Sequence, residues 1–293
     1  MERISFYDQI AVNKRKSWLL IFLIFLVFLA LGYVISRAYS PGSFFFIMII
    51  SIIISLMYIL ISYYNSDKIA IASVNAKPAS RTEHRMYYDL VEGLALASGL
   101  PMPKLYIMQN EQINAFATGR DPKHAVICVT AGALQKLNKQ ELEGVLSHEL
   151  SHVANFDIRF MTLAAVMVGM IAIISEIFLR SLWFKGNNRE GKGNAIFLLI
   201  GIALAILAPI AVQLVQLAIS RKREFTADAT AVKFTRTPTG LANALKKIKN
   251  DKPMKVSKAM APLFMSDPTR RKMQSWLSTH PSIDMRIKIL EKM

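Results

Sequence analysis

Long apolar stretches alternate with polar, charged segments along this 293-residue chain. Residues 18–35, 44–64 and 195–220 contain no charged side chain. A helix of about 20 mostly apolar residues spans a bilayer core, so these three stretches are predicted to be membrane helices rather than buried core helices. Residues 160–184 form a fourth predicted span, although one Glu and one Arg interrupt it.

The basic residues around these stretches predict how the chain is oriented. Four basic residues precede the first span, whereas Arg37 alone lies between the first and second. Because flanks rich in Lys and Arg stay in the cytoplasm, both termini and residues 65–158 are predicted to be cytoplasmic, with 36–43 and 185–194 outside. A signal peptide is the alternative for the first stretch, but its length and the span that follows favour an uncleaved anchor.

The polar remainder carries the helix and strand patterns of a small α/β region. Apolar residues at three- and four-residue spacing predict a helix that starts after Asn138, where Glu141 would complete a capping box. Gly144 of this helix would let another backbone approach closely. The other predictions are helices at 82–97, 220–234, 241–248 and 283–293, strands at 104–108 and 125–130, and a flexible connection at 250–278.

The predicted helix after Asn138 carries the motif His148-Glu149-Leu150-Ser151-His152. Residues four apart share one face of a helix, so both imidazoles can reach one metal ion. Zn²⁺ takes nitrogen, sulfur or oxygen ligands in a tetrahedral array, and a catalytic site leaves one position open. Glu149 could take a proton from the activated water and pass it to a leaving amine. The motif therefore predicts one catalytic Zn²⁺ per chain.

A catalytic zinc needs a third protein ligand. His84, His124 and His280 are the other histidines, and none stands at the metzincin spacing. Glu224 is the candidate, in a predicted helix where Asp228 lies four residues on and on the same face. The Asp228 carboxylate could accept the spare N–H of a ligating histidine. Two surface carboxylates that pair with neighbouring Arg and Lys side chains are an equally good interpretation.

Composition and charge favour a membrane protein and argue against a nucleic-acid-binding protein. The chain is 53% apolar, has a mean hydropathy of +0.33 and carries a net charge of +16. The basic residues flank the spans or lie in a Lys-rich segment at 246–258, and no nucleic-acid-binding motif is present. Attraction to an anionic membrane surface explains this charge, and no nucleic acid partner is expected. Cys128, the single cysteine, excludes an intramolecular disulfide and is predicted to be a buried apolar residue.

Taken together, these motifs resemble the HtpX-type membrane metalloproteases, relatives of the CAAX prenyl proteases and of the mitochondrial stress protease Oma. The resemblance covers nearly the whole chain, apart from the basic N-terminus and residues 250–278, which are less typical. It rests on the order of the spans, His148-Glu-Leu-Ser-His152, Ser220-Arg-Lys-Arg-Glu-Phe-Thr-Ala-Asp228, Asn114-Ala-Phe-Ala-Thr-Gly119 and Thr279-His280-Pro281.

The resemblance implies an α+β, mostly helical fold. A gluzincin-type catalytic domain would carry four transmembrane helices, two of them N-terminal and two forming a hairpin inserted between the zinc-ligand helices. The basic segment and first two spans would occupy 1–64, the first catalytic part with the His-Glu motif 65–158, the hairpin 159–220, and the second catalytic part 221–293.

The resemblance also implies roles for the site residues already identified. His148, His152 and Glu224 would bind zinc, Glu149 would act as the base, and Asp228 would orient a ligand.

Three further catalytic residues follow from the resemblance alone. Asn114 would help to hold the substrate or the oxyanion, whereas His280 and Arg286 would face the transition state. An extended peptide would add to the strand at 125–130, which would form the edge of the sheet.

The implied function is an endopeptidase of a bacterial-type inner membrane, with its catalytic domain in the cytoplasm. Its substrates would be peptides or damaged and misfolded membrane proteins, in quality control and the stress response. The alternative is a non-catalytic zinc-binding membrane scaffold or a transporter, for which Glu176 and Arg180 within a span would be suited. The intact Glu149 argues against that alternative, because a structural site has no use for a base.

Overall fold

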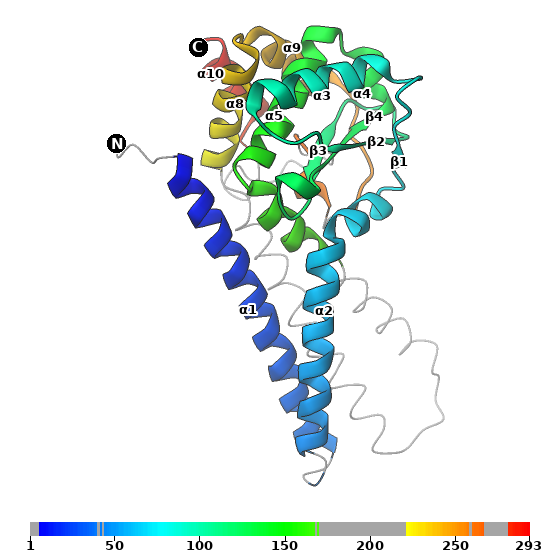
Figure 1. Ribbon diagram of the computed structural model, residues 1–293, viewed down its shortest axis with the longest axis vertical. Coiled ribbons are helices and arrows are strands. Elements are labelled where there is room, and N and C mark those ends of the chain that lie inside the picture. The colour runs from blue at the N-terminus through cyan, green and yellow to red at the C-terminus, as the bar shows by residue number, and fades with distance from the viewer. Residues whose placement is uncertain are drawn as a thin grey trace.

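The computed structural model describes residues 6–39, 42, 44–167, 169, 221–257, 260–266 and 281–293. Two long helices, α1 (Phe6–Tyr39) and α2 (Phe44–Ser73), extend from the part of the molecule that contains the sheet and meet at their far ends (Figure 1). At that meeting point Gly32 lies against Ser51, so closely that a Cβ atom at position 32 would overlap the serine side chain.

The helix α2 is, among the described residues, the one that is long and apolar enough to cross a membrane. Many of its large side chains face outwards, including Phe45, which is 80% exposed. It runs past the predicted end at 64, with a non-helical backbone at Asn65. The first predicted span forms part of α1, where Trp18 is 63% exposed.

The fourth predicted span lies outside the described residues, and the third is described only at residues 160–167 and 169. Residues 157–167, which include the start of the third, are helical.

A four-stranded sheet in the order β1-β2-β4-β3 lies beside the helices (Figure 1). The strands β2 and β4 run parallel, and the two outer pairings are antiparallel. The predicted strands at 104–108 and 125–130 are confirmed as β2 and β4. Two very short strands were not predicted from the sequence. The strands are β1 (Lys77–Pro78), β2 (Lys104–Met108), β3 (Ala115–Thr118) and β4 (Val126–Thr130).

The predicted edge of the sheet was wrong. Strand β4 lies between β2 and β3, with Phe116 opposite Cys128. The reason is that β3, only four residues long, pairs with β4 and takes the edge position. Cys128 is fully buried, as predicted.

The part of the molecule around the sheet is mostly helical, and the helix predictions at its core are confirmed. Asn138 and Glu141 form the expected capping box, with the side chain of each accepting from the backbone of the other. Gly99 ends α3 in the left-handed conformation, at φ 68°. Helix α4 was not predicted. The helices are α3 (Arg85–Ser98), α4 (Ala131–Lys136), α5 (Lys139–Ala154), α8 (Arg221–Thr235), α9 (Thr239–Asn250) and α10 (Ile283–Leu290).

Two glycines allow α5 and α9 to pack backbone against backbone. A Cβ atom at Gly144 would overlap the main chain of Leu241, and one at Gly240 would overlap the carbonyl of Gln140. This close approach was expected of Gly144, and it fixes the helix that carries the two histidines against its neighbour.

Residues 250–278 were predicted to be a flexible connection, and the part that the structure describes differs. A 3-10 turn, Ala261–Leu263, precedes Phe264, which forms an isolated antiparallel bridge with Phe116 of β3. The Met265 N–H donates to the Ala115 carbonyl at 2.9 Å. Because both Phe264 and Met265 are buried against the sheet, residues 260–266 belong to the folded core.

The Lys-rich segment also differs from the sequence interpretation. Lys246, Lys247 and Lys249 on α9 pair with Glu291, Glu141 and Asp284 respectively, at 2.6, 2.7 and 2.6 Å. Helix α9 lies at the end of the molecule opposite the tips of α1 and α2 (Figure 1). These three lysines therefore join α9 to neighbouring parts of the fold, in addition to any attraction to a membrane surface.

Candidate metal centre

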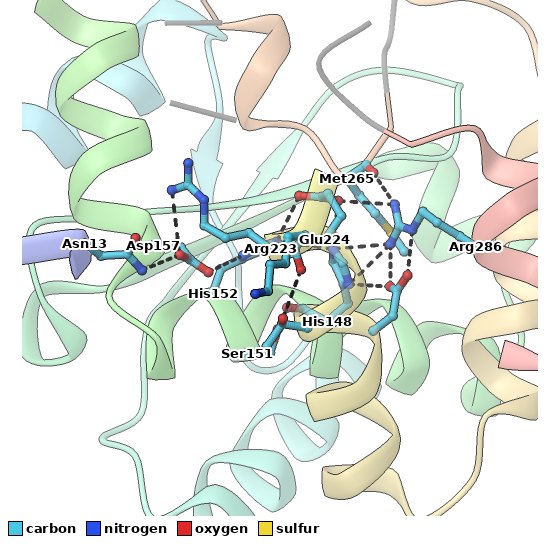
Figure 2. Close-up of polar contacts among 12 residues, drawn as sticks. Asn13, His148, Ser151, His152, Asp157, Arg223, Glu224, Met265 and Arg286 are labelled. Atoms are coloured by element: carbon cyan, nitrogen blue, oxygen red, sulfur yellow. Dashed lines mark hydrogen bonds and ion pairs between the residues drawn. The ribbon is translucent and has the colours of Figure 1, made fainter. Parts of the chain in front are cut away.

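Helices α5 and α8 bring the three predicted metal ligands together. The two histidines lie one turn apart on α5, and Glu224 projects from the first turn of α8 towards them (Figure 2). One ligand atom from each of His148, His152 and Glu224 lies within 4.8 Å of the others. All three residues are buried, with Glu224 only 2% exposed.

The distances between these atoms fit a tetrahedral metal ion. The Nε2 atoms of His148 and His152 are 3.3 Å apart, and the Glu224 oxygens lie 3.7 and 3.6 Å from them. Two atoms that bind one Zn²⁺ at about 2.0–2.2 Å and a tetrahedral angle are separated by roughly 3.3–3.6 Å. The residues present therefore fit a zinc ion without rearrangement of their backbone.

Glu149 lies on the same helix with its carboxylate in a dry environment. It is 1% exposed, and its Oε1 atom has no hydrogen-bond partner among the described residues. Burial raises the pKa of Glu149 to about 7, although the neighbouring His152 and a hydrogen bond from the Ala117 backbone act in the opposite direction. A carboxyl group with a pKa near neutrality can both accept and donate a proton.

Asp228 lies behind His148 and is held by Arg286. The Asp228 Oδ1 atom is 2.9 Å from His148 Nδ1, on the side of the ring away from His152. Burial opposes the ionised carboxylate, but Arg286 and His148 together lower the pKa of Asp228 to about 2. A carboxylate in this place fixes the tautomer of the ring, so that Nε2 is available to a metal.

Arg286 is buried and makes four kinds of contact within the site. Two of its nitrogens bind Asp228, at 2.6 and 2.9 Å, and a third donates to the Met265 carbonyl at 2.9 Å. The guanidinium also lies 3.4 Å from Glu224 and 3.3 Å from His148. Arg286 was predicted from resemblance alone, and the structure brings it into the ligand cluster.

Asp157 is a functional candidate that the sequence analysis missed. Its Oδ2 atom lies 3.1 Å from His152 Nδ1 (Figure 2). Burial alone would lower the pKa of His152, but Asp157 and Glu224 raise it to about 9. The two carboxylates therefore favour positive charge on the His152 ring. A signal was present, since Asp157 follows the helix end by only three residues.

Two further residues, Asn114 and His280, were predicted from the resemblance to be catalytic, and the structure describes one of them. The Asn114 amide donates to the Ser266 carbonyl at 3.2 Å, and its oxygen accepts from the Ala115 N–H at 3.0 Å. Asn114 thus joins β3 to the 260–266 segment. His280 lies outside the described residues.

Comparison with known proteins identifies the family of this chain. The model of Peptidase family M48 matches residues 81–293. A protein of Thermoanaerobacter pseudethanolicus named "Protease HtpX homolog" is 43% identical, over 100% of this chain and 99% of that protein. A protein of the same name from Caldanaerobacter subterraneus subsp. tengcongensis is 44% identical over the same shares.

Among solved structures, the crystal structure of S. mikatae Ste24p is similar, with 19% identity and a TM-score of 0.46, over 97% of this chain and 66% of that one. On the strength of the family model and the full-length relatives, this chain belongs to Peptidase family M48 and is a metalloprotease.

Proposed function

We propose that this metalloprotease is a zinc-dependent endopeptidase of a cell membrane, which hydrolyses damaged or misfolded membrane proteins from the cytoplasmic face. The observation that carries the proposal is the cluster of His148, His152 and Glu224, with interatomic distances of 3.3, 3.7 and 3.6 Å, beside the buried carboxylate of Glu149. A non-catalytic scaffold or transporter would not need that carboxylate.

The three ligands would hold one Zn²⁺ and leave a position open for water and substrate. Zinc bound there would act as a Lewis acid and make water a better nucleophile near neutral pH. Glu149 takes the proton from the attacking water and delivers it to the leaving amine. The Ala117 N–H of β3 binds the Glu149 carboxylate, so the strand at the sheet edge and the base are aligned with each other.

The buried carboxylates keep the imidazoles in place during this reaction. Asp228 accepts the Nδ1–H of His148, and Asp157 does the same for His152. Arg286 mainly holds Asp228, because its nitrogens are engaged by that carboxylate and by the Met265 carbonyl. His280 and Asn114 remain proposed donors to the developing oxyanion.

The membrane part of the proposal rests on the apolar stretches and on the long helices. A gluzincin-type domain divided into residues 65–158 and 221–293 would sit at the cytoplasmic ends of four spans. Helix α2 supports this arrangement through its length, its composition and its exposed apolar surface. A catalytic centre next to such helices would meet segments of membrane proteins as they leave the bilayer.

The test uses the full-length protein in detergent with an unfolded model membrane protein as substrate. Treatment with a chelator should abolish cleavage, and Zn²⁺ should restore it whereas Mg²⁺ should not, because imidazole-rich sites favour zinc over magnesium. Metal analysis first establishes that all zinc has been removed. If this zinc-free protein still cleaves the substrate at an unchanged rate, the proposal is overturned.

A further inference from the structure

The N-terminal helix α1 is packed against the region that follows the metal-binding helix. One face of α1 is buried at helical spacing, through Asn13, Ser17, Leu20 and Ile24. Leu20 and Ile24 share an apolar cluster with side chains of residues 160–167 and of α2. The first of these buried residues, Asn13, is polar and only 4% exposed, so its amide needs partners.

Those partners belong to the turn that ends α5. Asn13 Nδ2 donates to Asp157 Oδ1 at 2.6 Å (Figure 2). It also donates to the Asn155 carbonyl at 3.1 Å. Both partners are acceptors, so the amide must present its nitrogen to them and its orientation is unambiguous. The other oxygen of Asp157 lies 3.1 Å from His152 Nδ1. A continuous chain of hydrogen bonds therefore runs from α1 to a metal ligand.

The turn that ends α5 contains a residue in an uncommon backbone conformation. Phe156, between the two partners of Asn13, has a φ of 58°, which is uncommon for a bulky aromatic residue. Such conformations persist where the surroundings over-determine them. Lys14, the next residue of α1, places its ammonium 4.6 Å from the centre of the Phe156 ring, and Arg159 lies over the same ring at 5.4 Å. Two successive residues of α1 thus contact this turn.

Asp157 has no other partner as close as Asn13 among the described residues. Arg223 of α8 is 3.8 Å from the same Oδ1 atom, which is beyond hydrogen-bond distance. Without Asn13, the carboxylate could rotate towards Arg223 and leave the His152 ring free to turn about its χ2 angle.

We propose that Asn13 is a positioning residue for the metal centre, which holds Asp157 against His152 and so makes full metal affinity depend on the docking of helix α1. The inference rests on the proposed zinc site. In this proposal the N-terminal helix α1 helps to position the metal ligands, in addition to anchoring the protein in the membrane.

The experiment compares Asn13→Ala with Ser17→Ala in the full-length protein. Ser17 is a matched control, because it is buried on the same face of α1 and its hydroxyl donates to the Asn13 carbonyl of its own helix. Zinc affinity is measured by competition with a chelator, and ligand geometry by the visible spectrum of the Co²⁺ form. Each variant is first shown to be folded, and Asn13→Ser replaces Asn13→Ala if the latter is not.

Loss of a partner behind a metal ligand typically weakens metal binding about 10–100-fold. We expect this loss and an altered Co²⁺ spectrum for Asn13→Ala, with values like wild type for Ser17→Ala. In an Asp157→Ala background the Asn13 substitution should have little further effect, because Asn13 acts through Asp157.

A folded Asn13→Ala protein with the zinc affinity and Co²⁺ spectrum of wild type would overturn the inference, even if it were less stable to heat. The inference would also be overturned if Asn13→Ala lowered zinc affinity equally in the wild-type and Asp157→Ala backgrounds. Neither result touches the proposed function, which fails separately if the wild-type protein binds no zinc.

Discussion

Asp228 and Arg286, which are 58 residues apart, form a bidentate pair at 2.6 and 2.9 Å in which both side chains are about 1% exposed. The same carboxylate lies 2.9 Å from His148 Nδ1. This pair joins α8 to α10 and contacts His148, a proposed metal ligand, so its two residues are expected to affect both stability and metal binding.

Removal of one partner of this pair should lower the free energy of unfolding. Arg286→Ala would leave a buried carboxylate without its cation, which typically destabilises a protein by about 3–5 kcal/mol. Thermal and denaturant unfolding of the metal-free protein measures this loss. The double variant Arg286→Ala/Asp228→Ala should recover part of it, because no unpaired charge remains. An Arg286→Ala protein as stable as wild type would show that the pair is not important for the fold.

Substitutions of Glu224, the proposed metal ligand, and of Asp228, which lies behind His148, should have different effects on zinc binding. Glu224→Ala removes a metal bond and should abolish stoichiometric zinc binding, whereas Asp228→Ala should weaken zinc binding about 10–100-fold without removing it. Metal analysis after dialysis at defined free zinc distinguishes the two. If Glu224→Ala binds zinc as tightly as wild type, the third ligand lies elsewhere, and His280 is the next candidate.

Two Gly→Ala substitutions, one inside the contact between α5 and α9 and one outside it, should have opposite effects on stability. Gly144→Ala forces a methyl group against the main chain of Leu241 and should destabilise the protein by about 1–3 kcal/mol. Gly93 is exposed within α3, and a methyl group added there would meet no neighbouring atom within 4 Å. Gly93→Ala should therefore stabilise the protein by about 0.5–1 kcal/mol. Equal unfolding temperatures for the two variants would contradict the close packing.

The orientation in the membrane can be tested with single cysteines in a Cys128→Ser background. Lys123→Cys, at an exposed site of the soluble part, should be labelled by an impermeant reagent only after the cells are opened. Gly42→Cys, exposed between α1 and α2, should be labelled in intact cells. Labelling of position 123 from outside would reverse the proposed topology, and the Cys128→Ser parent shows the background.

The sequence was sufficient for the features that local signals encode. The capping box at Asn138 and Glu141 depends on neighbouring residues, and the start of α5 was located correctly. The predicted end of α3 at residue 97 is one residue from the observed end at Ser98. The residues of the candidate metal site could also be identified from the sequence, because His148 and His152 are one helical turn apart and Asp228 follows Glu224 by the same spacing.

Features that depend on distant residues were missed. Strand β3 is four residues long and buried on both faces, so it has no alternating pattern of apolar and polar residues. Its place at the edge of the sheet depends on its pairing with β4, which the sequence does not reveal. Phe264 meets Phe116 across almost 150 residues. The hydrogen bond from Asn13 to Asp157 joins residues that are 144 positions apart, beside a left-handed Phe156, and no spacing rule predicts it.

The central claim is that His148, His152 and Glu224 form a catalytic zinc site for which Glu149 is the base. The most direct test is Glu149→Gln, in which an amide of the same shape cannot take the proton from water. Zinc content and hydrolysis of a model membrane protein are measured on the same preparation. We predict one zinc ion per chain in both proteins and a rate of hydrolysis lowered by roughly 10²–10⁴-fold or more in the variant. Hydrolysis near the wild-type rate by zinc-replete Glu149→Gln would contradict this account.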